Sequence, residues 1–364
     1  MHEIHQSPPR TWAEIDRSAL LHNLKVARET SGCRVMAVLK AGAYGHDLKR
    51  ISEFLDPQDL AFFGVASVFE ARKLAKIGIK TRVYLLGPTF ADERQEIVHR
   101  RWTPSISNLE EAADFDSLNA VHSPDSPLPV HLTVDTGMGR GGFLPEQLSD
   151  ALPELLKFKH ISIEGIGSHL PSADEDRDFT LAQYENFHQA VANCQFDFKF
   201  IHLANSAGLL DYPSTVVNLC RPGLLLYGLS PIPKFQSQLK PVMTLKSRIS
   251  IIRDLPKGHG ISYGRTTILE RDSRIATVGI GYGDGYPRSA SHNNPEVYLH
   301  GKRCPIIGRI TMDQIMVDVT DLPPNVEARS GDELELFGSN ILATEVAEKA
   351  GTIPWEILTR ITPR

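Results

Sequence analysis

Five side chains that can transfer protons or bind anions follow short apolar runs of the sequence. Lys40 comes directly after RVMAVL, Arg140 lies in DTGMGRGGF, and His169 follows ISIEGIGS. Ser206 and Arg221 follow the next two apolar runs, in HLANSAG and CRPGLLLYG. A lysine amine can form a Schiff base with a carbonyl compound, and hydroxyl and backbone N–H groups in a turn can bind phosphate.

The elements that must position these side chains alternate between strand-like and helix-like segments up to about residue 238. Eight parallel β/α units are the number that closes a (β/α)8 TIM barrel, whose active sites lie at the C-terminal ends of the strands. The five side chains are therefore expected on one rim. The eight predicted strands are Arg34–Leu39, Ala61–Val65, Thr81–Leu86, Pro104–Ser107, Pro129–Asp135, Ile161–Ser168, Lys199–Leu203 and Val216–Leu219.

The turns after the seventh and eighth strands lie where TIM barrels commonly bind phosphate. A phosphate site and Lys40 on the same rim favour pyridoxal phosphate as cofactor. Each residue alone has an ordinary structural explanation, since a lysine at a strand end is usually solvated and loop glycines usually serve turns. The prediction therefore depends on their convergence.

A second domain is predicted after the Pro-rich segment SPIPKFQSQLKP, with residues 1–238 forming the barrel and 239–364 a mainly antiparallel β domain. Gly-rich turns separate its β-type runs, and one helix near Thr344–Ala350 is expected to close it. The predicted strands are Met243–Ile252, Arg274–Ile280, Glu296–Leu299, Cys304–Ile307, Gln314–Val319 and Glu333–Phe337.

Composition excludes several classes of protein. The 364 residues suggest about two domains, and a net charge of −5 argues against a nucleic-acid binder or a polybasic membrane-surface protein. No apolar run approaches the roughly 18 residues of a membrane helix. The four cysteines form no C-x-x-C pair, which indicates reduced thiols in a cytoplasmic protein and no metal site.

Seven motifs, in order along nearly the whole chain, closely resemble those of alanine racemases, which are fold-type III pyridoxal phosphate enzymes. The resemblance implies a barrel that binds the cofactor, alanine as substrate, and a homodimer whose active sites are shared between subunits. The motifs are LKAGAYGHD, DTGMGRGGF, HLANSAG, RPGLLLYGLSP, ISYGRTT, IGYGDGYPR and GRITMDQIMVDVT.

By this resemblance, Lys40 carries the cofactor and acts as the base on D-alanine. Tyr263, supplied by the partner subunit, acts as the base on L-alanine from the opposite face. The resemblance also implies that the cofactor phosphate is held by Tyr44, Ser206 and the backbone N–H groups of Gly223 and Leu224.

The same resemblance places Arg221 at the pyridine nitrogen, where its high pKa weakens the electron sink and suppresses transamination. His169 would pack on the pyridine ring, and His202 would support Arg221. Arg140 would bind the cofactor phenolic oxygen and approach the substrate carboxylate.

Three further residues are matched to the family in the β domain. The resemblance implies that the backbone N–H of Met312 binds the substrate carboxylate from the second subunit. Tyr282 would line the substrate channel, with Asp313 as a nearby carboxylate.

The sequence departs from the family pattern at several positions. Thr133 stands where a carbamylated lysine often orients the equivalent of Arg140, and we hypothesise that chloride or another side chain takes this role. Gly42 replaces a common Asn, and Trp355 a common Tyr. A C-terminal phosphate-binding tyrosine is not evident, so cofactor affinity is expected to differ.

Three alternatives remain open from sequence. A racemase of serine or of broad specificity is the nearest, because pocket breadth depends on packing. A pyridoxal phosphate carrier would be single-domain, and a related decarboxylase would need a catalytic cysteine, which Cys304 in GKRCPIIG does not resemble. The role would be D-alanine supply for peptidoglycan or alanine catabolism.

Overall fold

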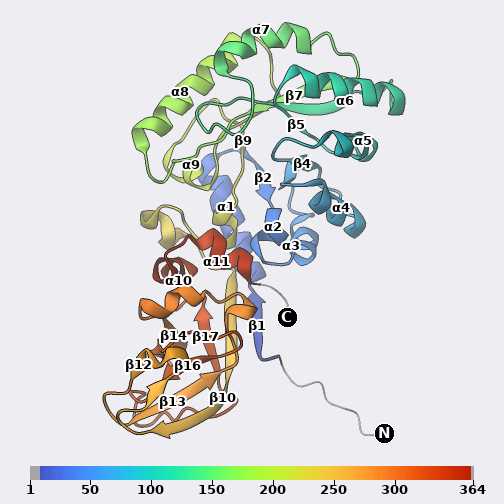
Figure 1. Ribbon diagram of the computed structural model, residues 1–364. Helices are drawn as coiled ribbons and strands as arrows, with labels where there is room; N and C mark the ends of the chain where they lie inside the picture. Colours follow the sequence, from blue (N-terminus) through green and yellow to red (C-terminus); the bar gives the residue numbers. More distant parts are fainter. Residues whose placement is uncertain (1–8, 362–364) are drawn as a thin grey trace, which may run out of the picture. The chain divides into compact units, whose positions relative to one another are not determined.

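The computed structural model describes residues 9–361 and divides the chain into two compact units (Figure 1). The barrel unit comprises Leu21–Leu226 with Ser230–Leu239, and the β unit comprises the described residues before Leu21, Tyr227–Leu229 and the chain from Lys240 onward. The predicted TIM barrel with an antiparallel β domain is confirmed. None of the helices in residues 9–361 has both the length and the apolar character needed to cross a bilayer.

Eight barrel strands are present as predicted, but the eighth, predicted at Val216–Leu219, lies at Leu219–Cys220 and shares only Leu219 with the prediction. Parallel pairing gives the orders β4-β3-β2-β9 and β5-β6-β7-β8. A parallel bridge between Tyr84 and Thr103 joins the first set to the second, and the N–H of Arg221 donates to the Ala204 carbonyl at 2.9 Å on the other side. The strands are β2 (Arg34–Val38), β3 (Phe62–Val65), β4 (Val83–Leu85), β5 (Ser105–Ile106), β6 (Leu128–Thr133), β7 (Ile161–Gly167), β8 (Phe200–His202) and β9 (Leu219–Cys220).

Several helices of this part of the chain begin at polar residues whose side chains accept backbone N–H groups. Ser67 caps the N-terminus of α4 and Gly78, with φ of 84°, ends it. Asn108, Asp176 and Asn205 cap α6, α8 and α9 in the same way. The helices are α1 (Arg17–Ser31), α2 (Lys40–Tyr44), α3 (Leu48–Leu55), α4 (Val68–Ile77), α5 (Ala91–Arg100), α6 (Leu109–His122), α7 (Pro145–Leu155), α8 (Arg177–Asn193) and α9 (Ser206–Asp211).

The barrel interior combines aromatic and imidazole rings. Phe62 is fully buried and makes edge-to-face contacts with Tyr84, Phe200 and His131, whose ring centroids lie 5.1–5.9 Å away. His202 lies beside Tyr84 and His131 in the same interior. The core of the barrel is thus partly polar, and those polar groups need hydrogen-bond partners.

The β unit contains a sheet of order β1-β10-β13-β16-β15-β14-β17, which an additional β10–β17 pairing curls back on itself. A two-stranded hairpin, β11–β12, lies outside this sheet. The strands are β1 (Thr11–Ile15), β10 (Met243–Leu255), β11 (Gly260–Ile261), β12 (Thr267–Ile268), β13 (Ser273–Val278), β14 (Glu296–Leu299), β15 (Lys302–Ile307), β16 (Ile315–Asp318) and β17 (Glu333–Phe337).

Two details of the β unit differ from the sequence analysis. Residues 1–238 were expected to form the barrel, but β1 pairs antiparallel with β10, from Thr11 opposite Ser247 to Ile15 opposite Met243. This pairing joins residues more than 200 positions apart, which local patterns do not reveal. One helix was expected to close the β domain, but two helices follow β17 in the described residues, α10 (Ala343–Ala350) and α11 (Pro354–Arg360). Pro354 is the first residue of α11, a position where proline is tolerated.

Removing the ring of Phe62 should strongly destabilise the barrel. We expect Phe62→Ala to lower the free energy of unfolding by about 3–5 kcal/mol, because the cavity lies among rigid rings. Chemical denaturation followed by circular dichroism measures the change. Val121→Ala, at a side chain that is 84% exposed, is the control and should change stability by less than about 0.5 kcal/mol. Equal effects of the two substitutions would contradict this description of the core.

Candidate active site

Lys40 begins a left-handed turn at the C-terminal end of β2. Ala41, Gly42, Ala43 and Tyr44 all have positive φ, between 52° and 66°. The Ala43 N–H donates to the Leu39 carbonyl at 2.8 Å, and the Gly45 N–H donates to the Ala41 carbonyl at 3.0 Å. A non-glycine residue in this region costs about 1–2 kcal/mol, so consecutive ones store strain directly beside Lys40.

A carboxylate from α4 holds this turn in place. Glu70 accepts hydrogen bonds from the backbone N–H groups of Ala41 at 2.6 Å and Ala66 at 2.8 Å. The Lys40 side chain is half-buried, and burial followed by the positive charge of Arg140 lowers its pKa, against the opposing effect of Glu70. A lowered pKa favours the neutral amine, the form that attacks a carbonyl or accepts a proton.

Tyr44, Ser206 and Gly223 converge on one small polar site. The Ser206 Oγ accepts hydrogen bonds from the N–H groups of Gly223 at 3.1 Å and Leu225 at 3.2 Å. A Cβ added to Gly223 would lie 2.3 Å from the Tyr44 hydroxyl oxygen, so only glycine allows this approach. Burial raises the pKa of Tyr44, which keeps its hydroxyl a hydrogen-bond donor. The predicted Leu224 N–H lies between the two observed donors in sequence.

Arg221 is buried with its guanidinium among neutral acceptors. One terminal nitrogen donates to His202 Nδ1 and to the His202 carbonyl at 3.0 Å. The other donates to the Ser168 carbonyl at 2.5 Å and lies 3.1 Å from His169 Nδ1. Within residues 9–361 no carboxylate lies within ion-pair distance of Arg221. Burial lowers the pKa of Arg221 to about 10, so the group still carries its charge at neutral pH.

The two histidines beside Arg221 are held neutral. Burial, followed by the charge of Arg221, lowers the pKa of His169 to about 3 and brings the pKa of His202 well below its usual value. The Ser168 hydroxyl lies 2.8 Å from the Thr136 hydroxyl, which in turn accepts from the Gln183 amide at 3.2 Å. These contacts fix the strand end from which Ser168 and His169 face Arg221.

Arg140 lies at a small cavity at the ends of the strands. The cavity has a volume of about 30 Å³, and its lining includes Thr133, Ser107, Asp135 and His169. Asp135 accepts hydrogen bonds from the backbone N–H groups of Met138 at 2.9 Å and of the adjacent loop residues, and so shapes the turn that carries Arg140. Among the residues that the structure describes, no carboxylate pairs with Arg140. No described side chain therefore substitutes for the family's carbamylated lysine at Thr133, and an anion in that role stays a prediction.

The remaining predicted residues lie in the β unit. Tyr263, in the turn between β11 and β12, is 72% exposed, and Met312 and Tyr282 are also exposed. Tyr263 and Asp313 line a cavity of about 780 Å³ together with Arg10, Arg253 and His259. Arg10 donates to the Asp313 carbonyl at 3.0 Å. The predicted site residues of the barrel thus form one group at the rim of the barrel. Those of the β domain form a second group within the β unit.

The barrel rim fits pyridoxal phosphate. Lys40 supplies the amine that the cofactor aldehyde requires, and the Tyr44–Ser206–Gly223 site supplies hydroxyl and backbone donors for its phosphate. Arg221 offers a donor that no described carboxylate occupies. Fold and rim together define a barrel enzyme of the pyridoxal phosphate class.

Comparisons with known proteins give the family. The alanine racemase N-terminal domain model matches residues 15–231, and the alanine racemase C-terminal domain model matches 242–364. The curated alanine racemase of Halothermothrix orenii is 37% identical, with 97% of this chain and 95% of the relative covered. That of Pseudomonas taetrolens is 39% identical, with 95% of each covered.

Solved structures agree with these sequence matches. Alanine racemase of Clostridium difficile 630 superposes with a TM-score of 0.89 at 32% identity, covering 98% of this chain and 94% of that one. The Bartonella henselae alanine racemase, solved with covalently bound pyridoxal phosphate, gives a TM-score of 0.89 at 29% identity and covers 98% of both chains. The chain belongs to the alanine racemase family, whose members are pyridoxal phosphate-dependent isomerases.

Three residues that position the rim from behind were not predicted from the sequence as functional. Glu70 lies at the third position of α4, after the capping Ser67, where a glutamate usually serves the helix alone. His131 lies inside the apolar strand β6. The only sign of its role in the sequence was a polar side chain within a segment whose other residues are mostly apolar. Asp135 was part of a quoted motif, but its role in shaping the loop was not assigned.

Gly42 should be the least costly residue at its position. Gly42→Ala is expected to lower the free energy of unfolding by about 1 kcal/mol, because a Cβ there meets no atom within 4 Å and the cost is the left-handed backbone alone. Gly42→Asn, the common family residue, should cost less, since Asn tolerates this conformation. Thermal and urea unfolding measure both.

Gly87→Ala is the matched control, because Gly87 also has open space but lacks a left-handed φ. It should leave stability unchanged or slightly higher. If Gly42→Ala and Gly42→Asn behaved like Gly87→Ala, the strain assigned to this turn would be absent.

Proposed function

We propose that the protein interconverts L-alanine and D-alanine with pyridoxal phosphate, using Lys40 and the partner subunit's Tyr263 as its two bases. The observation that carries this proposal is the convergence of Lys40, the phosphate site and the buried Arg221 at one end of the barrel. When bound, the cofactor withdraws electrons from the substrate so that its Cα proton can leave. Racemisation then requires a proton acceptor and donor on each face of Cα.

Lys40 serves the face from which the D-enantiomer loses its proton. Its half-buried amine has a lowered pKa because of burial and the nearby charge of Arg140, so the neutral form is more accessible than that of an exposed lysine. Glu70 fixes the backbone at Ala41, which holds Lys40 in place.

Tyr263 serves the opposite face from a second copy of the chain. Support comes from its exposure, 72%, at the tip of the β11–β12 hairpin, and Met312 of the same unit is exposed as well. A homodimer with shared active sites would cover these side chains and bring them to the partner's Lys40. This arrangement also separates the protein from single-domain carriers of the cofactor, which lack a β unit.

Arg221 directs the reaction toward racemisation. It would donate a hydrogen bond to the pyridine nitrogen and rarely give up a proton, since its pKa of about 10 keeps it charged. Arg221 would thereby keep the ring nitrogen of a bound cofactor unprotonated and the electron sink weak, which would shorten the time available for transamination. His169 would cover the ring, and His202 supports the guanidinium by the hydrogen bond already described.

Arg140 and the Met312 N–H would bind the substrate carboxylate, and Arg140 would also bind the cofactor phenolic oxygen. Arg140 is exposed on the rim and its charge lowers the pKa values of both Lys40 and His169. Serine differs from alanine by one hydroxyl, so activity toward serine depends on how closely the partner's Tyr282 and Asp313 approach. Alanine is the proposed preferred substrate.

In the cell, the product would be D-alanine for peptidoglycan, or the same reaction would begin alanine catabolism. A cytoplasmic location is proposed because the four cysteines are free thiols, which is the usual state in a reducing compartment.

Lys40 should be the residue that carries the cofactor. Borohydride reduction of the holoenzyme is expected to fix a pyridoxyl group on the peptide that contains Lys40, as read by mass spectrometry. Lys40→Ala should abolish this labelling, whereas Lys49→Ala, at an exposed lysine of α3, should retain it. Full labelling of Lys40→Ala at another lysine would contradict the assignment.

Tyr263 should act on one enantiomer only. In deuterium oxide, Tyr263→Phe is expected to slow Cα exchange of L-alanine by about 10²–10⁴-fold, the usual contribution of one acid–base group, and to preserve exchange of D-alanine. Proton NMR follows both. Tyr298→Phe, a half-buried tyrosine of β14, is the control. Equal exchange of both enantiomers by Tyr263→Phe would refute the two-base scheme.

A further inference from the structure

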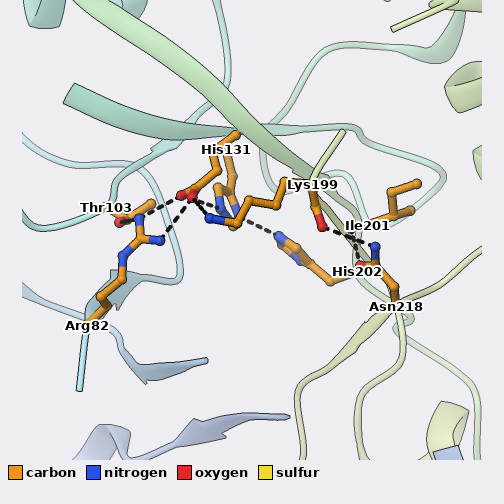
Figure 2. Close-up of polar contacts among 8 residues, drawn as sticks. Arg82, Thr103, His131, Lys199, Ile201, His202 and Asn218 are labelled. Atoms are coloured by element: carbon orange, nitrogen blue, oxygen red, sulfur yellow. Dashed lines mark hydrogen bonds and ion pairs between the residues drawn. The ribbon is translucent and has the colours of Figure 1, made fainter. Parts of the chain in front are cut away.

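A chain of hydrogen bonds runs from Arg221 into the barrel core through two buried imidazoles. Arg221 donates to His202 Nδ1, and His202 Nε2 lies 2.9 Å from His131 Nδ1. His131 is 0% exposed and His202 2%. Figure 2 shows the His131 and His202 rings beside each other, with Arg82 on the side of His131 away from His202 and the Lys199 side chain reaching past His131.

The direction of every bond in this chain is determined by its first member. An arginine guanidinium has five N–H donors and no acceptor, so His202 Nδ1 must accept. A neutral His202 then carries its proton on Nε2 and donates it to His131 Nδ1. His131 in turn must carry its proton on Nε2, which lies 4.0 Å from the Glu164 carboxylate.

Burial, helped by nearby cations, keeps either ring from taking a second proton. Arg221 lies at one end; at the other, Glu164 is held by Arg82 at 2.6 Å and Lys199 at 2.8 Å. Burial is the largest cause that lowers the pKa of His131 to about 3, and the three cations add to it against the effect of Glu164. Tyr84, the other titratable group beside the rings, has its pKa raised by burial to about 12 and stays neutral.

The neighbouring strand makes room for both rings. Gly165 and Gly167 of β7 lie in register with His131 of β6 and His202 of β8. A Cβ on Gly165 would lie 2.8 Å from the His131 ring, and one on Gly167 would lie 2.1 Å from the His202 ring. Two glycines at alternate positions weaken a buried strand. Their presence opposite the two rings is therefore a second, independent indication that the His131–His202 pair is a specific feature of this barrel.

We propose that His131 is a positioning residue for Arg221, which it holds in place by accepting the hydrogen bond that fixes the orientation of the His202 ring. The inference rests on the proposed function of Arg221 at the pyridine nitrogen. Without an acceptor at His131 Nδ1, the buried His202 Nε2–H has no partner, and the His202 ring gains by turning toward another acceptor. Its Nδ1 then leaves the Arg221 guanidinium, and Arg221 shifts away from the position in which it weakens the electron sink.

Two substitutions of His131 separate the acceptor from the ring. His131→Phe fills the space among Phe62, Tyr84 and Phe200 but removes the acceptor. His131→Asn removes the ring but places an amide oxygen where Nδ1 lies. If the hydrogen-bond acceptor matters, His131→Phe should disturb Arg221 and His131→Asn should not. If His131 only fills the core, His131→Asn should be the more damaging substitution.

The first measurement uses the protein without cofactor and does not depend on activity. Imidazole nitrogens of ¹⁵N-histidine-labelled protein are assigned by NMR with the His202→Gln variant as reference. We expect the His202 proton on Nε2 in the wild type, with the Nδ1 resonance of a hydrogen-bonded acceptor in the wild type and in His131→Asn, and the downfield-shifted Nδ1 resonance of an unbonded nitrogen in His131→Phe. A His202 Nδ1 resonance that is unchanged in His131→Phe, or a His202 proton on Nδ1 in the wild type, would overturn the inference.

The second measurement uses the holoenzyme and counts pyruvate formed per racemisation. Transamination converts alanine and pyridoxal phosphate into pyruvate and pyridoxamine phosphate, so the pyruvate yield reports the electron sink. His131→Phe should raise this ratio about tenfold, and His131→Asn should stay within about twofold of the wild type. His188→Phe, at a half-buried histidine that bonds Ser214, is the control for loss of stability.

The outcomes distinguish the two proposals. A wild type that binds no pyridoxal phosphate or does not racemise alanine would remove the proposed function and leave the result of the cofactor-free NMR measurement standing. An active wild type with an unchanged pyruvate ratio in His131→Phe would remove the positioning role of His131 alone. Parallel changes in His131→Phe and His188→Phe would assign the effect to stability and contradict the inference.

Discussion

Burying the Arg221 charge without a carboxylate is the constraint on which the barrel interior depends. An isolated cation in an apolar interior is costly unless its donors are met. Here the acceptors are the carbonyls of Ser168 and His202 and the imidazole nitrogens of His169 and His202. Since each imidazole must offer a lone pair to Arg221, each must be neutral. The polar core of the barrel follows from this requirement.

The same positive charge organises the rim above it. Arg221 and Arg140 both lower the pKa of Lys40, so the cations that attract a phosphate and a carboxylate also make the lysine a better base. A carboxylate beside Arg221 would cancel part of the positive charge that lowers the pKa of Lys40. It would also provide a group that could share a proton with the pyridine nitrogen of the cofactor. The choice of neutral acceptors therefore serves cofactor binding, proton transfer and control of the electron sink together.

Sequence reasoning identified the parts of the structure that local patterns encode. The eight barrel strands are short apolar runs, and the group around Lys40 and Arg221 follows from reading the residue after each run. The pairing of β1 with β10 escaped it because that pairing depends on contact between distant segments. His131 escaped because one polar residue in an apolar strand looks like any satisfied core histidine, and Gly165 looks like a turn former until its neighbour across the sheet is known.

The departure at Gly42 connects the backbone of the site to its chemistry. Lys40 must leave a buried strand and turn at once, and the left-handed turn does this within a few residues at a cost in strain. Part of that cost is offset by Glu70, whose carboxylate binds the Ala41 N–H and links the turn to the start of α4. A glycine at position 42 lowers the strain further, but it also gives the unfolded chain more freedom to lose on folding. Tight placement of Lys40 therefore depends on Glu70 more than on the residue that replaces the family's Asn.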